Sequence, residues 1–93
     1  MSDYGPVVDN PHLSRFELAV EGQLAFAAYQ LAPGRMIITH VETPPSLRGR
    51  GIASAVARGV LEAARQRGLA VTPRCRFMAA YVRRHPDEAD IAN

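Results

Sequence analysis

The chain is 93 residues long, 47% of its residues are hydrophobic, and its formal net charge at pH 7 is +2. This length supports one hydrophobic core and excludes a second domain, so we expect a single domain over residues 1–93 with its core over about residues 15–91. No apolar run approaches the ~20 residues that span a membrane, the first residues lack a secretory pattern, and the lone cysteine cannot form an internal disulfide, so we expect a cytosolic protein.

The first half of the chain predicts an antiparallel meander. Residues 1–12 contain two prolines and no regular pattern, and we expect an irregular, partly frayed lead-in there. Three segments follow in which hydrophobic residues alternate or run together as in strands: Arg15–Val20, Leu24–Leu31 and Met36–Val41. Short turns at Glu21–Gly22 and at residues 32–35 join them, and short connections favour antiparallel neighbours.

The second half predicts a helical crossover and a terminal helix. Over Gly51–Arg67 the apolar residues fall on one stripe at helical spacing, and Gly68 is placed to end this helix. Residues 69–72 predict a short strand stopped by Pro73, so strand, helix and strand form a right-handed parallel crossover. Residues 76–84 predict a second helix. The fold class is therefore α+β: a three-stranded antiparallel meander, a helical crossover to a parallel fourth strand, and a C-terminal helix.

Charge is distributed unevenly along the chain. Residues 1–43 carry two Arg against five acids, residues 44–85 carry nine Arg against Glu62, and residues 86–93 carry three acids. The basic middle favours an anionic ligand, with a nucleic acid as the alternative. We rank nucleic acid last because no strand offers the paired aromatic side chains on which bases stack.

The stretch Pro44–Ala53, between the third strand and the long helix, carries the clearest functional signal. Gly49 and Gly51 let the backbone approach a ligand closely. Arg48 and Arg50 add positive charge, and the first N–H groups of a helix have no partner within it. Because the helix dipole adds partial positive charge at this end, the stretch predicts a cradle for a pyrophosphate. An ordinary glycine-rich helix entry is the alternative.

The pattern Arg-x-x-Gly-x-Ala over Arg48–Ala53 resembles the pyrophosphate loop of the GNAT superfamily of acyl-CoA-dependent N-acetyltransferases. Three further segments occur in the order found in a family of very short GNAT-like proteins of the bacterial YjdJ type: His40–Pro45, Pro73–Phe77 and Tyr81–Pro86. The resemblance covers about residues 15–91. It implies the acetyl-CoA-binding half of such an enzyme, without the early helices that hold the acceptor. Thr43 stands where Val is more usual, and Asp87–Glu88 where an aromatic residue often occurs.

The resemblance also implies how acetyl-CoA binds. Its pyrophosphate would lie on the N–H groups of the loop residues Arg48, Gly49, Arg50, Gly51, Ile52 and Ala53. The pantetheine arm would pair like an added strand with the edge at Val41, Glu42 and Thr43, because the sheet of this superfamily splays after the third strand. The thioester would then point between the third and fourth strands, near Cys75.

Cys75 is the candidate nucleophile. It precedes the second helix and lies between Arg74 and Arg76, and both positive charge and a helix N-terminus favour the thiolate. A thiolate near a thioester could accept the acetyl group, giving an acetyl-cysteine. The alternatives are direct transfer to the amine, and a small buried cysteine that only packs.

Three more residues are candidates for proton transfer. His40 and Glu42 lie two residues apart on one side of a strand, and either could take the proton that an acceptor amine loses; an ordinary surface pair is the alternative. Tyr81 would protonate the departing thiolate, as a helix tyrosine does in many GNAT enzymes, or would only pack in the core. We interpret His85 as a helix C-terminal residue near the dipole. The histidines and Cys75 have no metal-ligand spacing, so we predict no metal.

The sequence therefore favours an acetyl-CoA-dependent N-acetyltransferase that acts on an amine, whose identity the sequence does not specify. The second hypothesis is a CoA-binding sensor or interaction module without catalysis, which the missing acceptor-holding helices favour. A homodimer would complete a cleft that a domain this small leaves exposed.

Overall fold

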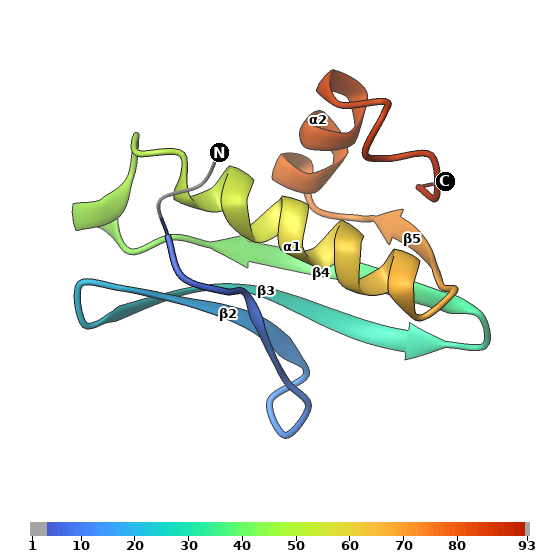
Figure 1. The fold of residues 1–93 in the computed structure, drawn as a ribbon, viewed down its shortest axis with the longest axis horizontal. Coiled ribbons are helices and arrows are strands. Elements are labelled where there is room, and N and C mark those ends of the chain that lie inside the picture. The colour runs from blue at the N-terminus through green and yellow to red at the C-terminus, as the bar shows by residue number, and fades with distance from the viewer. Residues whose placement is uncertain (1–3, 93) are drawn as a thin grey trace.

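The computed structural model describes residues 4–92, which form a sheet covered on one face by two α-helices (Figure 1). In chain order the elements are β1 (Val8–Asn10), β2 (Arg15–Val20), β3 (Gln23–Ala32), β4 (Arg35–Glu42), the 3₁₀ turn η1 (Pro45–Leu47), α1 (Ile52–Gln66), β5 (Ala70–Pro73) and α2 (Arg76–Arg84). The strands have the spatial order β1-β2-β3-β4-β5, and all neighbours are antiparallel except β4 and β5, which are parallel.

The predicted α+β fold class is confirmed, with meander, helical crossover, parallel strand and C-terminal helix in the expected order. β2 and α2 have the predicted bounds, and α1 begins and ends one residue inside the predicted helix. The prediction of an irregular lead-in is wrong at Val8–Asn10, which adds a further antiparallel strand beside β2; residues 1–3 lie outside the described part. Asp and Asn are poor strand formers and prolines flank the segment, so its sequence has no pattern from which a strand could be predicted.

The core lies between the sheet and the helices. The stripe predicted for α1, at Ile52, Val56, Val60 and Ala64, is buried. α2 adds Met78 to the same cluster. Burial of an aliphatic side chain contributes about 1.5–3 kcal/mol, so this stripe fixes α1, and with it the loop at its N-terminus, against the sheet. Within residues 4–92, no helix combines the length and apolarity that crossing a membrane requires.

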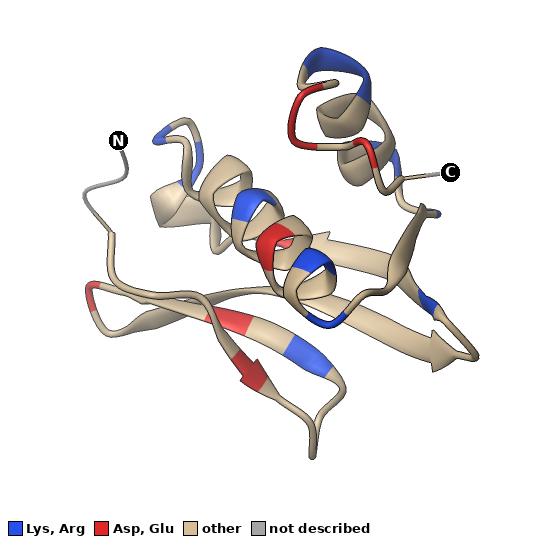
Figure 2. Ribbon diagram, turned by 45° about the vertical axis from the view of Figure 1, so that its right-hand side comes forward, with Lys and Arg blue, Asp and Glu red and all other residues tan. Residues whose placement is uncertain are grey.

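The C-terminal tail, residues 86–92, folds back beside α1 and β5. Glu88 and Asp90 pair with Arg58 and Arg65 of α1, with N–O distances of 3.4 and 2.6 Å. A parallel bridge from the tail also extends the outer edge of β5. Basic side chains of α1 therefore pair with acidic ones of the tail, and Figure 2 marks the basic positions of α1 in blue and the acidic positions of the tail in red.

Residues Tyr4–Asn10 form an N-terminal strap that lies beside α1 and passes below it in the view of Figure 1. Near the start of the helix, the Tyr4 hydroxyl donates a 2.6 Å hydrogen bond to the Arg50 carbonyl. Near its end, the Asp9 carboxylate accepts a 2.9 Å hydrogen bond from Arg67. The strap is therefore attached at both ends of α1.

Gly59, in the middle of α1, lies directly under the strap. A Cβ placed there would lie 2.6 Å from both Cβ and Cγ2 of Val7, closer than real side chains approach. Glycine in a helix interior costs about 1 kcal/mol relative to alanine. Because Gly59 has no side chain, Val7 of the strap can pack directly on the helix. The sequence of α1 therefore favours the packing of the strap at this position.

We expect Gly59→Ala to lower the free energy of unfolding by about 1 kcal/mol, because overpacking against Val7 outweighs the gain in helix propensity. In a Val7→Gly background the clashing Cβ is absent, and the same substitution should instead stabilise the protein by up to ~1 kcal/mol. Urea unfolding of the four proteins measures both differences. Destabilisation of equal size in both backgrounds would contradict the close contact.

Candidate functional site

The loop between β4 and α1 presents open backbone at a helix N-terminus. Leu47 and Ile52, each 1% exposed, anchor its two sides in the core. Between them Gly49 and Gly51 have φ angles of 79° and 77°, which residues with a Cβ rarely adopt. Within the described residues no side chain caps α1, and its first turn closes with Ala55 N–H donating to the Gly51 carbonyl. The N–H groups that precede this bond are therefore left for a ligand or water.

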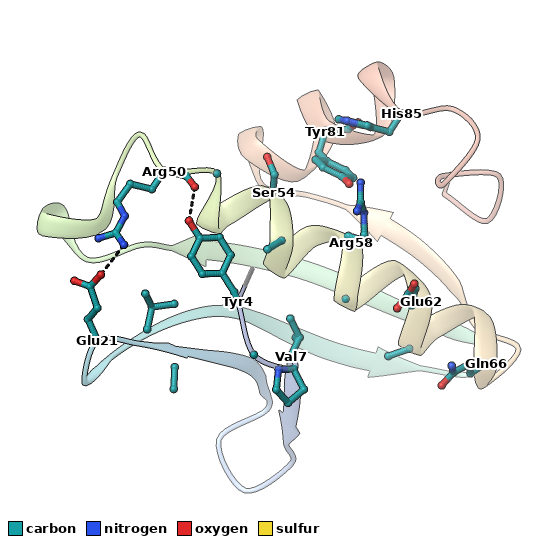
Figure 3. Close-up of a pocket in the computed structure, with 18 residues that line it drawn as sticks. Tyr4, Val7, Glu21, Arg50, Ser54, Arg58, Glu62, Gln66, Tyr81 and His85 are labelled. Carbon is teal, nitrogen blue, oxygen red and sulfur yellow. Dashed lines mark hydrogen bonds and ion pairs between the residues drawn. The ribbon is translucent and has the colours of Figure 1, made fainter. Parts of the chain in front are cut away.

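The two arginines of this loop have different partners. Arg48 Nε lies 3.4 Å from the Thr43 carbonyl, so this side chain links the middle of the loop to its beginning. Arg50 Nη2 lies 2.6 Å from the Glu21 carboxylate in the turn between β2 and β3 (Figure 3). The guanidinium holds the pKa of Glu21 below its ordinary value. The charge of Arg50 is thus shared with a carboxylate, whereas Arg48 stays at the loop.

β4 has an open edge beyond Ile38. Its pairing with β5 ends where Ile38 lies opposite Pro73, and the Ile38 carbonyl accepts hydrogen bonds from Arg74 N–H (3.0 Å) and Cys75 N–H (3.3 Å). β4 then continues through residues 39–42, which have no β5 residue opposite them. The sheet therefore opens between β4 and β5, and Cys75 lies at the point of separation.

A β-bulge turns His40 and Glu42 away from the core. Ile38 is fully buried, and an uninterrupted pleat would direct His40 to the same face. The register between β3 and β4 shifts at Thr39, so that Val41 packs against the core and the residues on either side of it are exposed. Bulges occur often beside active sites, where they redirect a side chain.

His40 and Glu42 form a pair on the helix-free face of the sheet. The Nε2 and Oε1 atoms are 3.1 Å apart, and the side chains are 57% and 49% exposed. The ring centroid of Phe26 lies 6.1 Å from that of His40, and the Arg15 guanidinium lies 4.6 Å above the Phe26 ring. An imidazole and a carboxylate are thus available to a substrate beside the open edge of β4.

Cys75 is the N-cap residue of α2. Its Sγ accepts a 3.3 Å hydrogen bond from the Met78 N–H, and its side chain is half-buried. Arg74 and Arg76 on either side are exposed. The N-terminus of a helix, with basic neighbours, is one of the settings in which reactive cysteines occur.

Tyr81 has its own set of partners. Its side chain is 4% exposed, its hydroxyl donates a 2.6 Å hydrogen bond to Glu88, and its ring stacks on His85 at the end of α2 with centroids 4.0 Å apart. Burial, with a further effect from Glu88, raises the pKa of Tyr81 to about 12. Figure 3 shows the ring directed toward Arg58 of α1. The hydroxyl of Tyr81 is therefore held between the tail and α1.

A groove of about 1100 Å³ runs along the exposed side of α1 (Figure 3). The strap and the turn at Glu21 form one wall, and Tyr81 and His85 form the other. At one end the groove reaches the glycine loop, since Arg50 and Gly51 line it. Sequence patterns did not identify this groove, because they did not place the strap beside α1.

A family model described as GCN5-related N-acetyl-transferase matches residues 15–91 of the chain. The match includes the open edge of β4, the glycine loop and Cys75, whereas the whole strap, which contains β1, precedes it. No curated protein matches the chain.

The Tyr81 hydroxyl is the largest cause that holds the pKa of Glu88 below its ordinary value of 4.5, with a smaller contribution from Arg58. A carboxylate with a lowered folded-state pKa stabilises the fold above its unfolded pKa, and this contribution is lost as the pH falls through the folded pKa. We therefore expect Glu88→Gln to destabilise the protein at neutral pH and to have a progressively smaller effect in acid. Thermal unfolding across this pH range measures the difference. The control is Asp87→Asn, which changes an exposed neighbouring carboxylate, and a pH-independent effect of Glu88→Gln would contradict the assignment.

Proposed function

Because the chain belongs to the GCN5-related N-acetyltransferase family, we propose that it binds acetyl-CoA and transfers the acetyl group to an amine. The observation that carries this proposal is the separation of β4 from β5 after Ile38, with Cys75 at the point of separation. This gap lies at the end of the sheet where the uncapped N-terminus of α1 also lies. An extended thioester with an anionic end matches that combination of features.

The glycine loop is the proposed site for the diphosphate. Backbone N–H groups at a helix N-terminus bind phosphate oxygens well, and the helix dipole favours their negative charge. No heavy atom lies within 4 Å of a Cβ built at Gly49 or Gly51, so a ligand has room to approach the backbone. The residues proposed to contact the diphosphate are Arg48, Gly49, Arg50, Gly51, Ile52 and Ala53.

The edge of β4 is the proposed site for the pantetheine arm. An extended chain with amide groups adds to an unpaired strand edge through backbone hydrogen bonds. Such an edge is available at Val41, Glu42 and Thr43, where β5 no longer runs beside β4. An arm that starts at the diphosphate and follows this edge would bring its thioester toward Cys75.

Acetyl-CoA at 100 times its dissociation constant should add about 2.7 kcal/mol to the free energy of unfolding. Gly51→Val should abolish the resulting rise in melting temperature, because a branched side chain at φ 77° distorts the loop and occupies the ligand space. The matched control is Gly34→Val: Gly34, in the β3–β4 turn, has a φ of 70° and is equally open. The control should lose stability but keep the ligand-induced shift.

A protein whose melting temperature responded to neither acetyl-CoA nor CoA would contradict the proposed function. A shift that survived in Gly51→Val as fully as in Gly34→Val would contradict the assignment of the diphosphate to this loop.

The proposed covalent route uses Cys75 as the nucleophile. Its thiolate attacks the thioester carbonyl carbon, the bond from that carbon to the CoA sulfur breaks, and CoA leaves as a thiolate. The acceptor amine then attacks the acetyl-cysteine, regenerates the Cys75 thiolate and loses a proton to His40 or Glu42. Tyr81 is the proposed proton donor to the CoA thiolate, a step in which its hydroxyl has to leave Glu88. Direct transfer from acetyl-CoA to the amine is the alternative route.

We expect intact-mass measurement after mixing with acetyl-CoA to show one added acetyl group, absent in Cys75→Ser. Serine is the matched variant because its hydroxyl retains the N-cap hydrogen bond of α2 and therefore the fold. Undiminished turnover by Cys75→Ser would exclude the covalent route and leave direct transfer. In the same assay, His40→Gln and Glu42→Gln identify the base, since the variant without it should accumulate acetyl-cysteine without forming product.

CoA binding without catalysis is the second candidate function. It is favoured by the exposure of His40 and Glu42 on the sheet face that has no helix over it, where the described residues offer no element to hold an acceptor. Tight CoA binding without product in a broad screen of amines would support this reading over transfer.

A further inference from the structure

The peptide unit between Arg50 and Gly51 is the least constrained part of the proposed diphosphate loop. Gly49 and Gly51, which flank Arg50, both have positive φ angles. Glycine adopts positive and negative φ with similar ease, so this peptide plane could turn over at little cost if nothing held it. A turned peptide would move the Gly51 N–H away from any ligand it serves.

The strap holds this peptide. The Tyr4 hydroxyl donates a 2.6 Å hydrogen bond to the Arg50 carbonyl, and Figure 3 shows the ring of Tyr4 directed at that oxygen. In a trans peptide the C=O and the N–H point in opposite directions. The bond that draws the Arg50 carbonyl toward the strap therefore directs the Gly51 N–H away from the strap.

The position of Tyr4 is itself fixed by packing. Val7, three residues further on, occupies the space above Gly59. Asp9 is bonded to Arg67 of α1 (2.9 Å). The strap therefore presents the Tyr4 hydroxyl to the loop from a fixed base.

Glu21 binds the side chain of Arg50, the residue whose carbonyl is bonded to Tyr4. Its carboxylate lies 2.6 Å from Arg50 Nη2, and its backbone has a φ of 52°, in the region that favours glycine. Arg50 is thus attached through its carbonyl to the strap, and its guanidinium is held mainly by the β2–β3 turn, with a smaller effect of Tyr4 that also raises the pKa of Arg50. The strap residues that act here precede residues 15–91, which match the family model.

We propose that Tyr4 is a positioning residue for diphosphate binding, which acts through the Arg50 carbonyl to aim the Gly51 N–H. This inference rests on the proposed binding of acetyl-CoA at the glycine loop. Tyr4 need not contact the ligand. Its hydroxyl keeps the ligand-free loop in the conformation in which the Gly51 N–H points toward the diphosphate site. Such preorganisation raises affinity because the loop need not be ordered on binding.

The test is Tyr4→Phe, which removes only the hydroxyl and keeps the ring. Calorimetric titration with CoA and with dephospho-CoA should show about fivefold weaker binding of both, as expected for the loss of one hydrogen bond. Pantetheine, which lacks the diphosphate, should bind both proteins equally. The Gly51 amide resonance in the ligand-free protein should also shift, which a merely structural change elsewhere in the strap would not produce.

Tyr29→Phe is the matched control, since it also removes one hydroxyl hydrogen bond, at the far end of the strap. It removes the 2.7 Å hydrogen bond from the Tyr29 hydroxyl to Asp9 and should lower stability. The affinity for CoA should stay unchanged, because Val7 over Gly59 and the bond between Asp9 and Arg67 still fix the part of the strap that carries Tyr4. Equal CoA affinity of Tyr4→Phe and the unsubstituted protein would overturn the proposal. So would equal weakening for pantetheine, or equal weakening of CoA binding by Tyr29→Phe. If the unsubstituted protein bound no CoA, the proposed function itself would be overturned, and this inference with it.

Discussion

The geometry of the candidate site depends on the burial of one apolar stripe of α1 against the sheet. Ile52, Val56 and Val60 are almost completely covered, which fixes both the axis of the helix and its rotation. Because β4, α1 and β5 form a parallel crossover, the N-terminus of α1 and the carboxyl ends of both strands lie at the same end of the sheet. The uncapped N–H groups, the open edge of β4 and Cys75 share that end for this reason.

Much of the positive charge in the middle of the chain is used within the fold. Acidic residues from the two ends of the chain pair with arginines of the middle: Glu21 with Arg50, Asp9 with Arg67, Glu88 with Arg58 and Asp90 with Arg65. Each exposed pair contributes only ~0–1 kcal/mol, but together they hold the strap and the tail beside α1 (Figure 2). Among the described residues Arg48 takes part in no ion pair, whereas the other arginine of the loop, Arg50, is paired with Glu21. We therefore expect the guanidinium of Arg48 to interact with the diphosphate.

Elements with a strong repeating pattern could be predicted from the sequence, and features set by long-range contacts could not. β2 and α2 each bury one face at regular spacing, and their predicted bounds are confirmed. The strap depends on contacts such as Tyr4 with Arg50, which no local pattern encodes. The bulge at Thr39 could not be predicted either, because the apolar run of β4 contains no glycine or proline to indicate it. This bulge nevertheless determines that Val41 packs against the core and His40 does not. The roles of the candidate site residues stay predictions.

Exposure of the His40–Glu42 pair limits how transfer could occur. A base and a developing charge interact far more strongly where water is excluded than where it is not, and these side chains are 57% and 49% exposed. Both helices cover the opposite face of the sheet (Figure 1), so the described residues do not cover the pair. If transfer occurs here, the acceptor itself or a second subunit has to supply that cover. An acceptor bound on the helix-free face would then cover the proposed thioester site from that side, so acceptors would be selected by how well their surface fits this face.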